Sequence, residues 1–286
     1  MNADEIYLNL VRNILNNGVK KTDRTGTGTI SLPFQQMRFD LTDNKIPLLT
    51  TKKMFTKGII HEILWYLMGS TNIKYLVDNG IHIWDAWADE NGELGPVYGS
   101  TWRNWPTYKE HDYIDYSKSD DKTYVFGNPI DQIAECVYKL RTNPTDRRII
   151  FSAWNVAELP KMRLPPCHAF AQFWSDGCGG LSLHLYQRSK DVGLGSPFNI
   201  VQYSILAHMF AHVTGHVAKE FVLTAGDVHI YNNHIDALKE QCTRESYASP
   251  TLKLNPKIKE IDDFKFEDFE IVGYQHHPTI KMEVSV

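Results

Sequence analysis

The stretch PPCHAFAQFWSDGCGGLSLHLYQRSKD, residues 165–191, predicts two strands joined by a tight reversal. Its two opening prolines fix the backbone directly before Cys167, so the thiol leaves a rigid turn rather than a frayed loop. Three glycines between positions 177 and 180 mark the reversal, and LSLHLYQ alternates apolar and polar residues as a strand does. The returning strand is therefore expected to bring Arg188 alongside Cys167.

An arginine next to a cysteine favours the thiolate, because the positive charge lowers the pKa of the thiol. The thiolate is the nucleophilic form, so this pairing indicates covalent catalysis by Cys167. A buried structural cysteine in a β-hairpin is the alternative for any single cysteine. The Pro-Pro-Cys-His setting, with His168 directly after the thiol, and the later Arg188 favour the nucleophile.

Composition is that of an ordinary globular protein, with 286 residues of which 42% are hydrophobic and 22% charged. The net charge of −4 gives no general attraction to nucleic acid or anionic membranes, so an anion would need a local arginine cluster. No stretch has transmembrane length, and the first residues lack the apolar core of a signal peptide. The four cysteines have neither paired nor metal-type spacing, so reduced thiols and a cytoplasmic location are expected.

Hydrophobic spacing in the rest of the chain predicts helices and further strands around this hairpin. Helical spacing covers residues 4–17, 56–68, 131–142 and 199–214. Glycines at positions 18 and 215 are expected to end the first and the last of these helices. The segments RRIIFSAW, AFAQFW, LSLHLYQ and VAKEFVLT are predicted to be strands.

Two segments depart from regular spacing. Between residues 29 and 39 the apolar positions change parity, which predicts a bulge or kink near Gln35 and Gln36. Residues 104–130 are rich in Tyr, Asp, Lys and Ser and are predicted to form a surface insertion. No linker divides the chain, so we expect one α+β domain.

Several charged residues stand where a plain fold would not require them. Glu62 lies at the edge of an apolar helix stripe, where it either faces water or is partly buried with a raised pKa. Arg147 and Arg148 precede a strand and form either a phosphate-sized positive spot or a solvated pair. Arg24 in TDRTGTGT is open to the same two interpretations, although this glycine-rich run lacks the Lys-Ser/Thr ending of a Walker loop.

A second polar group of residues surrounds the segment DVGLGSPFN. Asp191 and Asn199 flank this loop, and Asn199 is expected to open the following helix as an N-cap or to recognise a base. A carboxamide offers one donor and one acceptor side by side, which matches uracil N3–H and O4. His229 and Tyr231 are two residues apart, so in a strand they share a face and could hold a sugar hydroxyl.

Three histidines could hold a metal, since His208, His212 and His216 follow one another at four-residue spacing. Gly215 is expected to end the helix before His216, and no glutamate completes a His-Glu-x-x-His pattern. The polar face of a packed helix is therefore the favoured interpretation, and no metal is expected.

Nine segments resemble the thymidylate synthase family and occur in that family's order: DRTGTGT, TTKK, IIHEILWYLMGSTN, IWDAWADENGELGPVYG, DRRIIFSAWN, LPPCH, YQRSKDVGLGSPFN, GDVHIYNNH and HPTIKMEVSV. The resemblance covers nearly the whole chain, apart from the insertion at about 106–128. It implies a single α+β domain over 1–286, with a large mixed β-sheet at a homodimer interface flanked by helices. It also implies reductive methylation of dUMP to dTMP, with 5,10-methylenetetrahydrofolate as donor of carbon and hydride and dihydrofolate as product.

The resemblance also implies roles for individual residues. Cys167 would attack C6 of uracil, and the other catalytic groups would be Glu62, Tyr98, His168, Arg188 and Asn199. Residues implied to bind dUMP are Arg24, Arg147, Arg148, Arg188, Ser189, Asp191, Asn199, His229 and Tyr231, with Arg147 and Arg148 reaching the neighbouring subunit. Residues implied to bind folate are Lys52, Ile83, Trp84, Asp191, Leu194, Gly195, Phe198 and Val286, the last by closing over the ligands. No metal is implied.

Four positions depart from the commonest wording of the family. Lys190 stands where a small residue is usual, Ser196 replaces an aliphatic residue, Arg163 replaces a small one, and Ala225 stands where glycine is common. A polar folate pocket at Ser196 could admit water, which keeps open a dUMP hydroxymethylase that captures the same methylene intermediate with water. An RNA-binding translational repressor is an alternative of another class, disfavoured by the acidic balance and the lack of a long basic, aromatic-laced strip.

Overall fold

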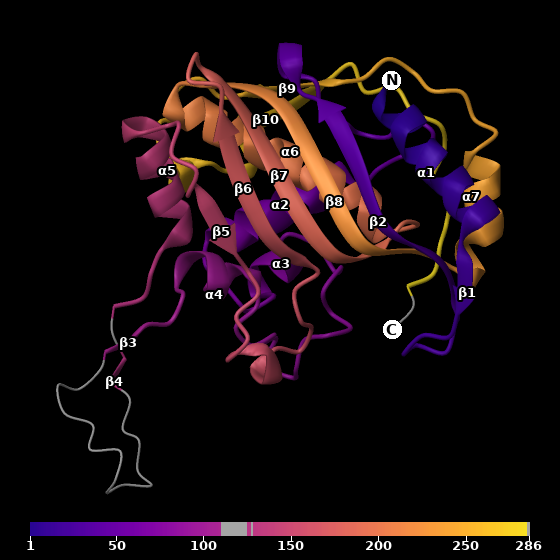
Figure 1. Ribbon diagram of the computed structural model, residues 1–286, viewed down its shortest axis with the longest axis horizontal. Coiled ribbons are helices and arrows are strands. Elements are labelled where there is room, and N and C mark those ends of the chain that lie inside the picture. The colour runs from indigo at the N-terminus through magenta and orange to yellow at the C-terminus, as the bar shows by residue number, and fades with distance from the viewer. Residues whose placement is uncertain (110–124, 127, 285–286) are drawn as a thin grey trace, which may run out of the picture.

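A mixed sheet of six strands organises the chain, in the order β1-β2-β8-β7-β6-β5 (Figure 1). The computed structural model describes residues 1–109, 125–126 and 128–284. Neighbouring strands are antiparallel except β7 and β8, which run parallel. The strands are β1 (Val19–Lys21), β2 (Thr29–Asp40), β5 (Ile150–Ser152), β6 (His168–Ser175), β7 (Gly180–Asp191) and β8 (Val217–Tyr231).

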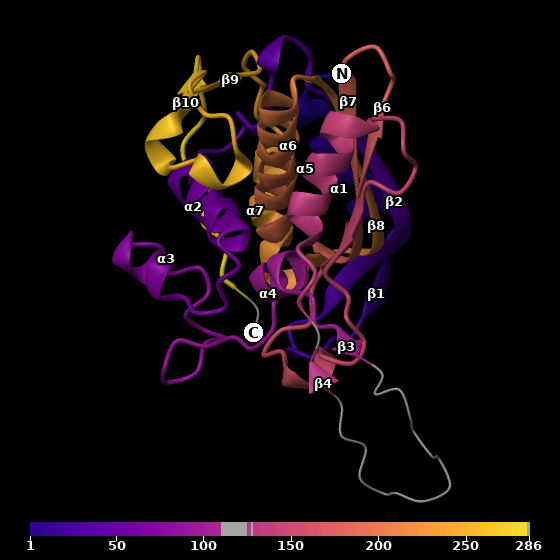
Figure 2. The same cartoon turned by 90° about the vertical axis from the view of Figure 1, so that its left-hand side faces the viewer.

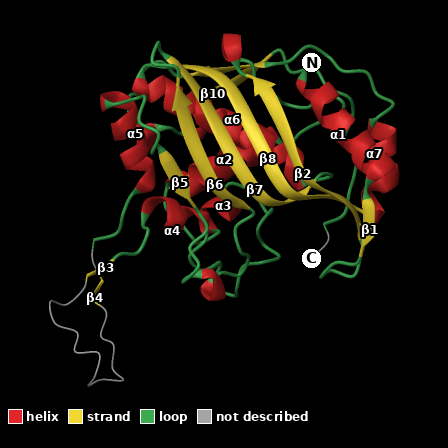
Figure 3. Cartoon of the chain, viewed as in Figure 1, coloured by secondary structure: helices red, strands yellow, loops and turns green. Residues whose placement is uncertain are grey.

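Helices cover one face of this sheet and leave the other face open (Figures 1 and 2). α6 crosses from β7 to β8, as a parallel pair requires, and lies between the sheet and α2. The α-helices are α1 (Ala3–Asn17), α2 (Thr56–Leu67), α3 (Lys74–Asp78), α4 (Tyr98–Arg103), α5 (Gln132–Thr142), α6 (Gly195–Thr214) and α7 (Ile235–Gln241). Short 3-10 turns occur at Thr42–Asn44, Leu159–Lys161, Asn232–His234, Ile261–Asp263 and Phe266–Asp268. The predicted class, an α+β domain with helices flanking a mixed sheet, is confirmed (Figure 3).

The first and the last predicted helices end where glycine was expected to end them. α1 is closed by Gly18, whose N–H donates to the carbonyl of Ile14, and it opens with an Asn2–Glu5 capping box. α6 ends at Gly215, which has the left-handed φ of 74° that glycine adopts without strain.

The predicted start of α6 at Asn199 is wrong, because the helix begins at Gly195. Pro197 occupies the first turn, where no intrahelical N–H bond is required, so the helix includes this proline. Asn199 therefore lies inside the helix, and the interpretation of this residue as an N-cap is excluded.

The predicted irregularity in the second strand is present and lies at Phe34, one residue before Gln35. Phe34 has a φ of 46°, which is rare for a residue other than glycine. Pairing with β8 keeps one register on both sides of Phe34, so the strand is kinked without an inserted residue. Buried apolar positions consequently pass from Ile30 to Met37 and Phe39, which explains the change of parity.

The same irregularity continues across the neighbouring strands. Gly226 of β8 lies opposite Phe34 of β2, and Arg188 of β7 lies opposite Gly226 on the other side. The regular strand pairing is interrupted at these three residues. A Cβ on Gly226 would lie 2.8 Å from the carbonyl oxygen of Arg188, so a larger residue does not fit. Because of the kink, Gln187 and Lys190 are both buried, although they stand three residues apart in one strand.

The predicted surface insertion at 106–128 falls largely outside the described part of the chain. At its base, β3 (Tyr108–Lys109) and β4 (Val125–Phe126) form an antiparallel ribbon that leaves the body of the protein (Figure 1). A second small sheet pairs β9 (Thr251–Leu254) with β10 (Phe269–Val272). Among the described residues, no helix is both long and apolar enough to cross a membrane.

Candidate active site

The β6–β7 hairpin brings Cys167 and Arg188 together, as the sequence predicts. The N–H of Arg188 donates to the carbonyl oxygen of Cys167 at 2.9 Å. The Arg188 guanidinium donates to the carbonyl oxygens of Pro166 and Pro165, each at 2.8 Å. The two prolines thus fix the thiol and also anchor the arginine beside it.

The expected lowering of the thiol pKa is wrong for the chain alone. Burial raises the pKa of Cys167, and the opposing charge of Arg188 does not offset it, while Asp191 adds a further rise. The geometry of a nucleophile is present, but the Cys167 thiol is protonated at neutral pH in this environment.

Tyr98, at the start of α4, holds the backbone around the thiol. Its hydroxyl oxygen accepts the N–H of Cys167 at 2.8 Å and that of His168 at 3.4 Å. Burial raises the pKa of Tyr98, so the phenol keeps its proton and can still donate it. The ring of His168 lies 5.1 Å from that of Tyr98.

His168 is buried in a neutral state. Burial lowers the pKa of His168 to about 3, with a smaller lowering from Lys190, whereas a hydrogen bond to Asn199 opposes this shift. Its Nδ1 has no hydrogen-bond partner among the described residues. A neutral imidazole can donate and accept at once, which suits a proton relay.

Glu62 of α2 is a buried acid, so the alternative of a carboxylate facing water is excluded. Its Oε1 accepts from Trp84 Nε1 at 2.6 Å and its Oε2 accepts from Gln202 Nε2 at 2.8 Å. Burial raises the pKa of Glu62 to about 7, against smaller lowering effects from its hydrogen bonds. A carboxyl group that titrates near neutrality can both give and take protons.

Asn199 faces β7 from the first half of α6. Its Oδ1 accepts from Gln187 Nε2 at 2.9 Å, and both side chains are buried. Gln187 has no role among the sequence predictions, although its place among the polar residues that precede Asp191 was a usable signal.

Asp191 joins β7 to the loop before α6 and to the C-terminal segment. Its carboxylate accepts the N–H of Gly193 at 2.9 Å, and His234 Nδ1 lies 3.7 Å away. Burial raises the pKa of Asp191, but His234 and other partners outweigh this and leave it below its usual range. His234, whose Nε2 contacts the carbonyl of Glu283 at 2.7 Å, was missed, although it ends the quoted motif GDVHIYNNH.

His229 and Tyr231 share a face of β8, as predicted, with ring centroids 5.1 Å apart. His229 Nδ1 lies 3.0 Å from Asp227. Ser189 pairs in register with Asp227, which places its backbone beside the same strand. Arg24 is exposed in the turn before β2.

Arg147 and Arg148 lie far from the thiol of their own chain. Both are exposed and precede β5, whose register with β6 places Arg148 level with Trp174. Cys167 precedes the other end of β6, so the strand between Cys167 and Trp174, at roughly 3.3 Å per residue, separates the two ends by about 20 Å. The chain alone does not bring these arginines to Cys167.

The residues expected to bind folate border the same region. Trp84 donates a hydrogen bond to Glu62. Leu194 and Gly195 lie at the start of α6, and Ile83 and Phe198 are partly buried against the core. Val286 lies outside the described residues.

Lys52 is not a free cation on the surface. It is buried, and its Nζ donates to the carbonyl of Gly193 at 2.8 Å. Burial lowers the pKa of Lys52 to about 8, although Asp191 opposes the shift. A contact with a folate tail would require this hydrogen bond to open.

The three spaced histidines of the predicted helix do not form one ligand set. His208 Nε2 contacts the carbonyl of Lys45 at 2.9 Å, and His212 Nε2 contacts that of Ile258 at 3.0 Å. His216 lies beyond the end of α6 at Gly215. In the described part of the chain, no group of three or more His, Cys, Asp or Glu could hold a metal ion.

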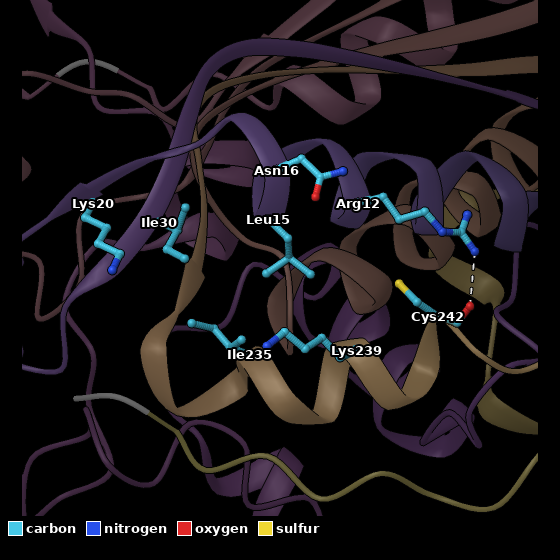
Figure 4. A pocket seen from close by; sticks show the side chains of 8 residues that line it. All are labelled: Arg12, Leu15, Asn16, Lys20, Ile30, Ile235, Lys239 and Cys242. Carbon is cyan, nitrogen blue, oxygen red and sulfur yellow. Dashed lines mark hydrogen bonds between the residues drawn. The ribbon is translucent and has the colours of Figure 1, made fainter.

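A separate pocket of about 440 Å³ lies between α1, the β1–β2 strands and α7 (Figure 4). Arg12 borders it and donates to the carbonyl of Cys242 at 3.1 Å. The lining is Arg12, Leu15, Asn16, Lys20, Ile30, Ile235, Lys239 and Cys242. It contains none of the residues implied to bind dUMP or folate.

A sequence profile described as thymidylate synthase matches residues 5–286. The match includes every site residue placed above. The family comprises methyltransferases that bind dUMP and use methylenetetrahydrofolate as co-substrate.

Proposed function

Because the chain belongs to the thymidylate synthase family, we propose that it converts dUMP to dTMP by reductive methylation. The donor of carbon and hydride is 5,10-methylenetetrahydrofolate, and dihydrofolate is the second product. The observation that carries the proposal is one buried cluster, in which Cys167 and Tyr98 share a hydrogen bond and Glu62 titrates near neutrality.

Cys167 adds through sulfur to C6 of the uracil ring, and the C5=C6 electron pair moves to C5 and the O4 carbonyl. This covalent step makes C5 nucleophilic enough to attack the folate methylene carbon. The thiol proton must leave first, since burial raises the pKa of Cys167. The positive charge of Arg188 favours this loss.

Glu62 serves the proton transfers that open the folate and release it. A pKa of about 7, caused by burial, supports this role because both protonation states are populated near neutrality. Tyr98 assists removal of the C5 proton, since its hydroxyl lies against the Cys167 backbone. Neutral His168 and Asn199 complete the relay.

For dUMP, Asn199 pairs with the base, His229 and Tyr231 hold the sugar, and Asp191 borders the same pocket. Arg24, Arg188 and Ser189 hold the phosphate from this chain. Arg147 and Arg148 hold the phosphate of a second copy, because about 20 Å of strand separates them from their own Cys167. The open sheet face, with exposed Trp174 and Val217, is the proposed homodimer interface.

For the folate, the proposed lining consists of residues from the segment before α2, the connection between α3 and α4, the end of β7, the start of α6 and the C-terminus. Lys52 would release Gly193 to meet the glutamate tail. The lining is Lys52, Ile83, Trp84, Asp191, Leu194, Gly195, Phe198 and Val286.

One observation favours a second candidate, a dUMP hydroxymethylase. Ser196 is fully buried at the start of α6, and its Oγ has no hydrogen-bond partner among the described residues. A hydroxyl in this position could order a water that attacks the exocyclic methylene in place of hydride.

Product analysis separates the two reactions. Enzyme, dUMP and methylenetetrahydrofolate are incubated, and the nucleotide and folate products are both identified. Thymidylate with dihydrofolate supports the proposal, whereas hydroxymethyl-dUMP with tetrahydrofolate replaces it by the second candidate. A salt-titrated RNA-binding assay tests the translational repressor, because a true RNA binder loses affinity steeply with salt.

A further inference from the structure

We propose that Lys190 is a positioning residue that selects uracil over cytosine by fixing the orientation of two buried amides. The inference rests on the proposed function, in which Asn199 reads the pyrimidine. It concerns a residue that stands where the family usually has a small one.

Lys190 is an unusual occupant of the protein interior. Its side chain is 0% exposed and lies on the inner side of β7, just beyond the kink at Arg188. No carboxylate forms an ion pair with it among the described residues, and its one recorded hydrogen bond is to Gln187 Oε1 at 3.3 Å. A buried amine without an anionic partner is costly, so packing alone does not account for it.

The chemistry of lysine imposes a direction on the neighbouring amides. Burial lowers the pKa of Lys190 to about 7, although Asp191 opposes the shift, so the ammonium form dominates at pH 6. An ammonium donates and never accepts, so in this form Gln187 must present Oε1 to Lys190. Its Nε2 then points to Asn199 and donates to Oδ1 at 2.9 Å. The amide of Asn199 is thereby fixed, with Nδ2 as its remaining donor.

This fixed orientation matches uracil. Nδ2 of Asn199 can donate to O4, and the second lone pair of Oδ1 can accept from N3–H. Cytosine presents the opposite pattern, an amine at C4 and an acceptor at N3. To read cytosine, Asn199 would have to flip, and Gln187 would have to flip with it. Protonated Lys190 opposes that double flip, because an ammonium cannot accept a hydrogen bond from Nε2 of Gln187.

The test compares Lys190→Met with the parent for binding of dUMP and dCMP at pH 6, where Lys190 is protonated, without folate. Methionine is unbranched like lysine and one heavy atom shorter, and it removes the donor. We expect the preference for dUMP to fall by roughly tenfold or more. The melting temperature should stay the same or rise, since an unpaired buried amine becomes apolar.

Two further variants separate orientation from packing. Lys190→Gln keeps an NH2 donor but adds a carbonyl acceptor, so it should restore only part of the preference for dUMP. Gln187→Glu removes the donor to Asn199 and should shift the preference toward dCMP even with Lys190 in place. Circular dichroism and melting temperature establish which variants fold, and the same ratio is measured on each folded one.

The outcomes also distinguish this inference from the proposed function. A parent that fails to bind dUMP contradicts the proposed function itself. A parent that prefers dUMP, with a ratio unchanged within about threefold in Lys190→Met and in Gln187→Glu, overturns the role of Lys190 alone.

Discussion

The two halves of α6 both bury polar side chains, but the halves differ in whether these side chains have hydrogen-bond partners. In the C-terminal half, His208 and His212 each bond a backbone carbonyl, at 2.9 Å and 3.0 Å. In the N-terminal half, Ser196 Oγ and Gln202 Oε1 have no partner within the described parts of the chain. Buried polar atoms normally have hydrogen-bond partners. The unpaired atoms therefore indicate that the N-terminal half of α6 (the open half) serves the reaction, and that the C-terminal half (the closed half) serves the fold.

The largest effect is expected at the thiol of Cys167, the proposed nucleophile. Cys167→Ala should lower turnover by at least about ten-thousandfold, because no covalent adduct can form. The fold and dUMP binding should persist. A 5-fluoro analogue of dUMP with the folate should form a covalent complex with the parent and none with the variant. An adduct found by mass spectrometry on Cys136, Cys178 or Cys242 would mean that the nucleophile is misassigned.

Glu62 accepts a hydrogen bond from Gln202, whose Oε1 is unpaired among the described residues. Removal of the Glu62 carboxyl group should have the next largest effect. Glu62→Gln should lower kcat by about a hundredfold to ten-thousandfold, since a general acid and base is lost. The dependence of stability on pH gives a second test of the buried Glu62 carboxyl group. Burial raises the pKa of Glu62 from 4.5 to about 7, so the native state binds more protons than the unfolded state in that window. Stability of the parent therefore falls as pH rises from 4.5 to 7.

That fall in stability should be missing from Glu62→Gln, which has no proton to lose. Urea denaturation of both proteins at several pH values between 4 and 8 measures the difference in slope. Parallel stability curves would show that Glu62 is not the buried acid that titrates in this range.

Asn199 lies in the N-terminal half of α6, and its replacement is expected to change specificity as well as rate. Asn199→Asp should shift the preference from dUMP toward dCMP, because a protonated aspartate can donate to N3 and accept from the C4 amine. Mispairing one buried hydrogen bond costs about 1–3 kcal/mol, or roughly one to two decades in specificity. The ratio of kcat/KM for the two nucleotides measures it. A ratio within about threefold of the parent's would assign uracil recognition to another residue.

The exposed arginines test whether the site needs a second chain. Mixing inactive Cys167→Ala with inactive Arg148→Glu should recover up to about one quarter of parental activity, because half the dimers are mixed and each holds one intact site. Activity is assayed after subunit exchange has been verified by mass. Full exchange with no recovered activity would place Arg148 outside the shared site.

Much of the fold was predictable because it rests on local patterns. The hairpin at Cys167, the ends of α1 and α6, and the kink near Gln35 all follow from glycine, proline and alternation in short windows. The start of α6 was not predictable in this way, since Pro197 is compatible with both a loop and a first helical turn. The continuation of the kink through Gly226 and Arg188 depends on which strands are neighbours, and no local window contains that information.

For the site, residue types were predictable and electrostatics were not. The pairing of Cys167 with Arg188 followed from the hairpin, but the sign of the thiol pKa shift depends on burial by distant segments. Glu62 was left between two interpretations for the same reason, because Trp84 and Gln202 reach it from other elements. Gln187 and His234 were missed, since their importance comes from Asn199 and Asp191, each in contact through the fold.

The smallest effect on activity is expected in the closed half of α6. His208→Phe leaves the Lys45 carbonyl without its hydrogen bond and should destabilise the protein by about 1–3 kcal/mol. Turnover should stay within about twofold of the parent, because His208 touches no proposed site residue. Burial lowers the pKa of His208, so the parent should also lose stability as pH falls below 6.5, and the variant should lack this loss.

The matched variant in the open half is Gln202→Met, which removes the amide that holds Glu62. In contrast to His208→Phe, Gln202→Met should clearly lower kcat, because Glu62 loses a hydrogen bond. It should cost little stability, because the unsatisfied Oε1 is removed with the amide. Chemical denaturation and steady-state kinetics on both variants give the four values needed. If His208→Phe lowered kcat as much as Gln202→Met, closure of hydrogen bonds would not separate structural from catalytic residues in this helix.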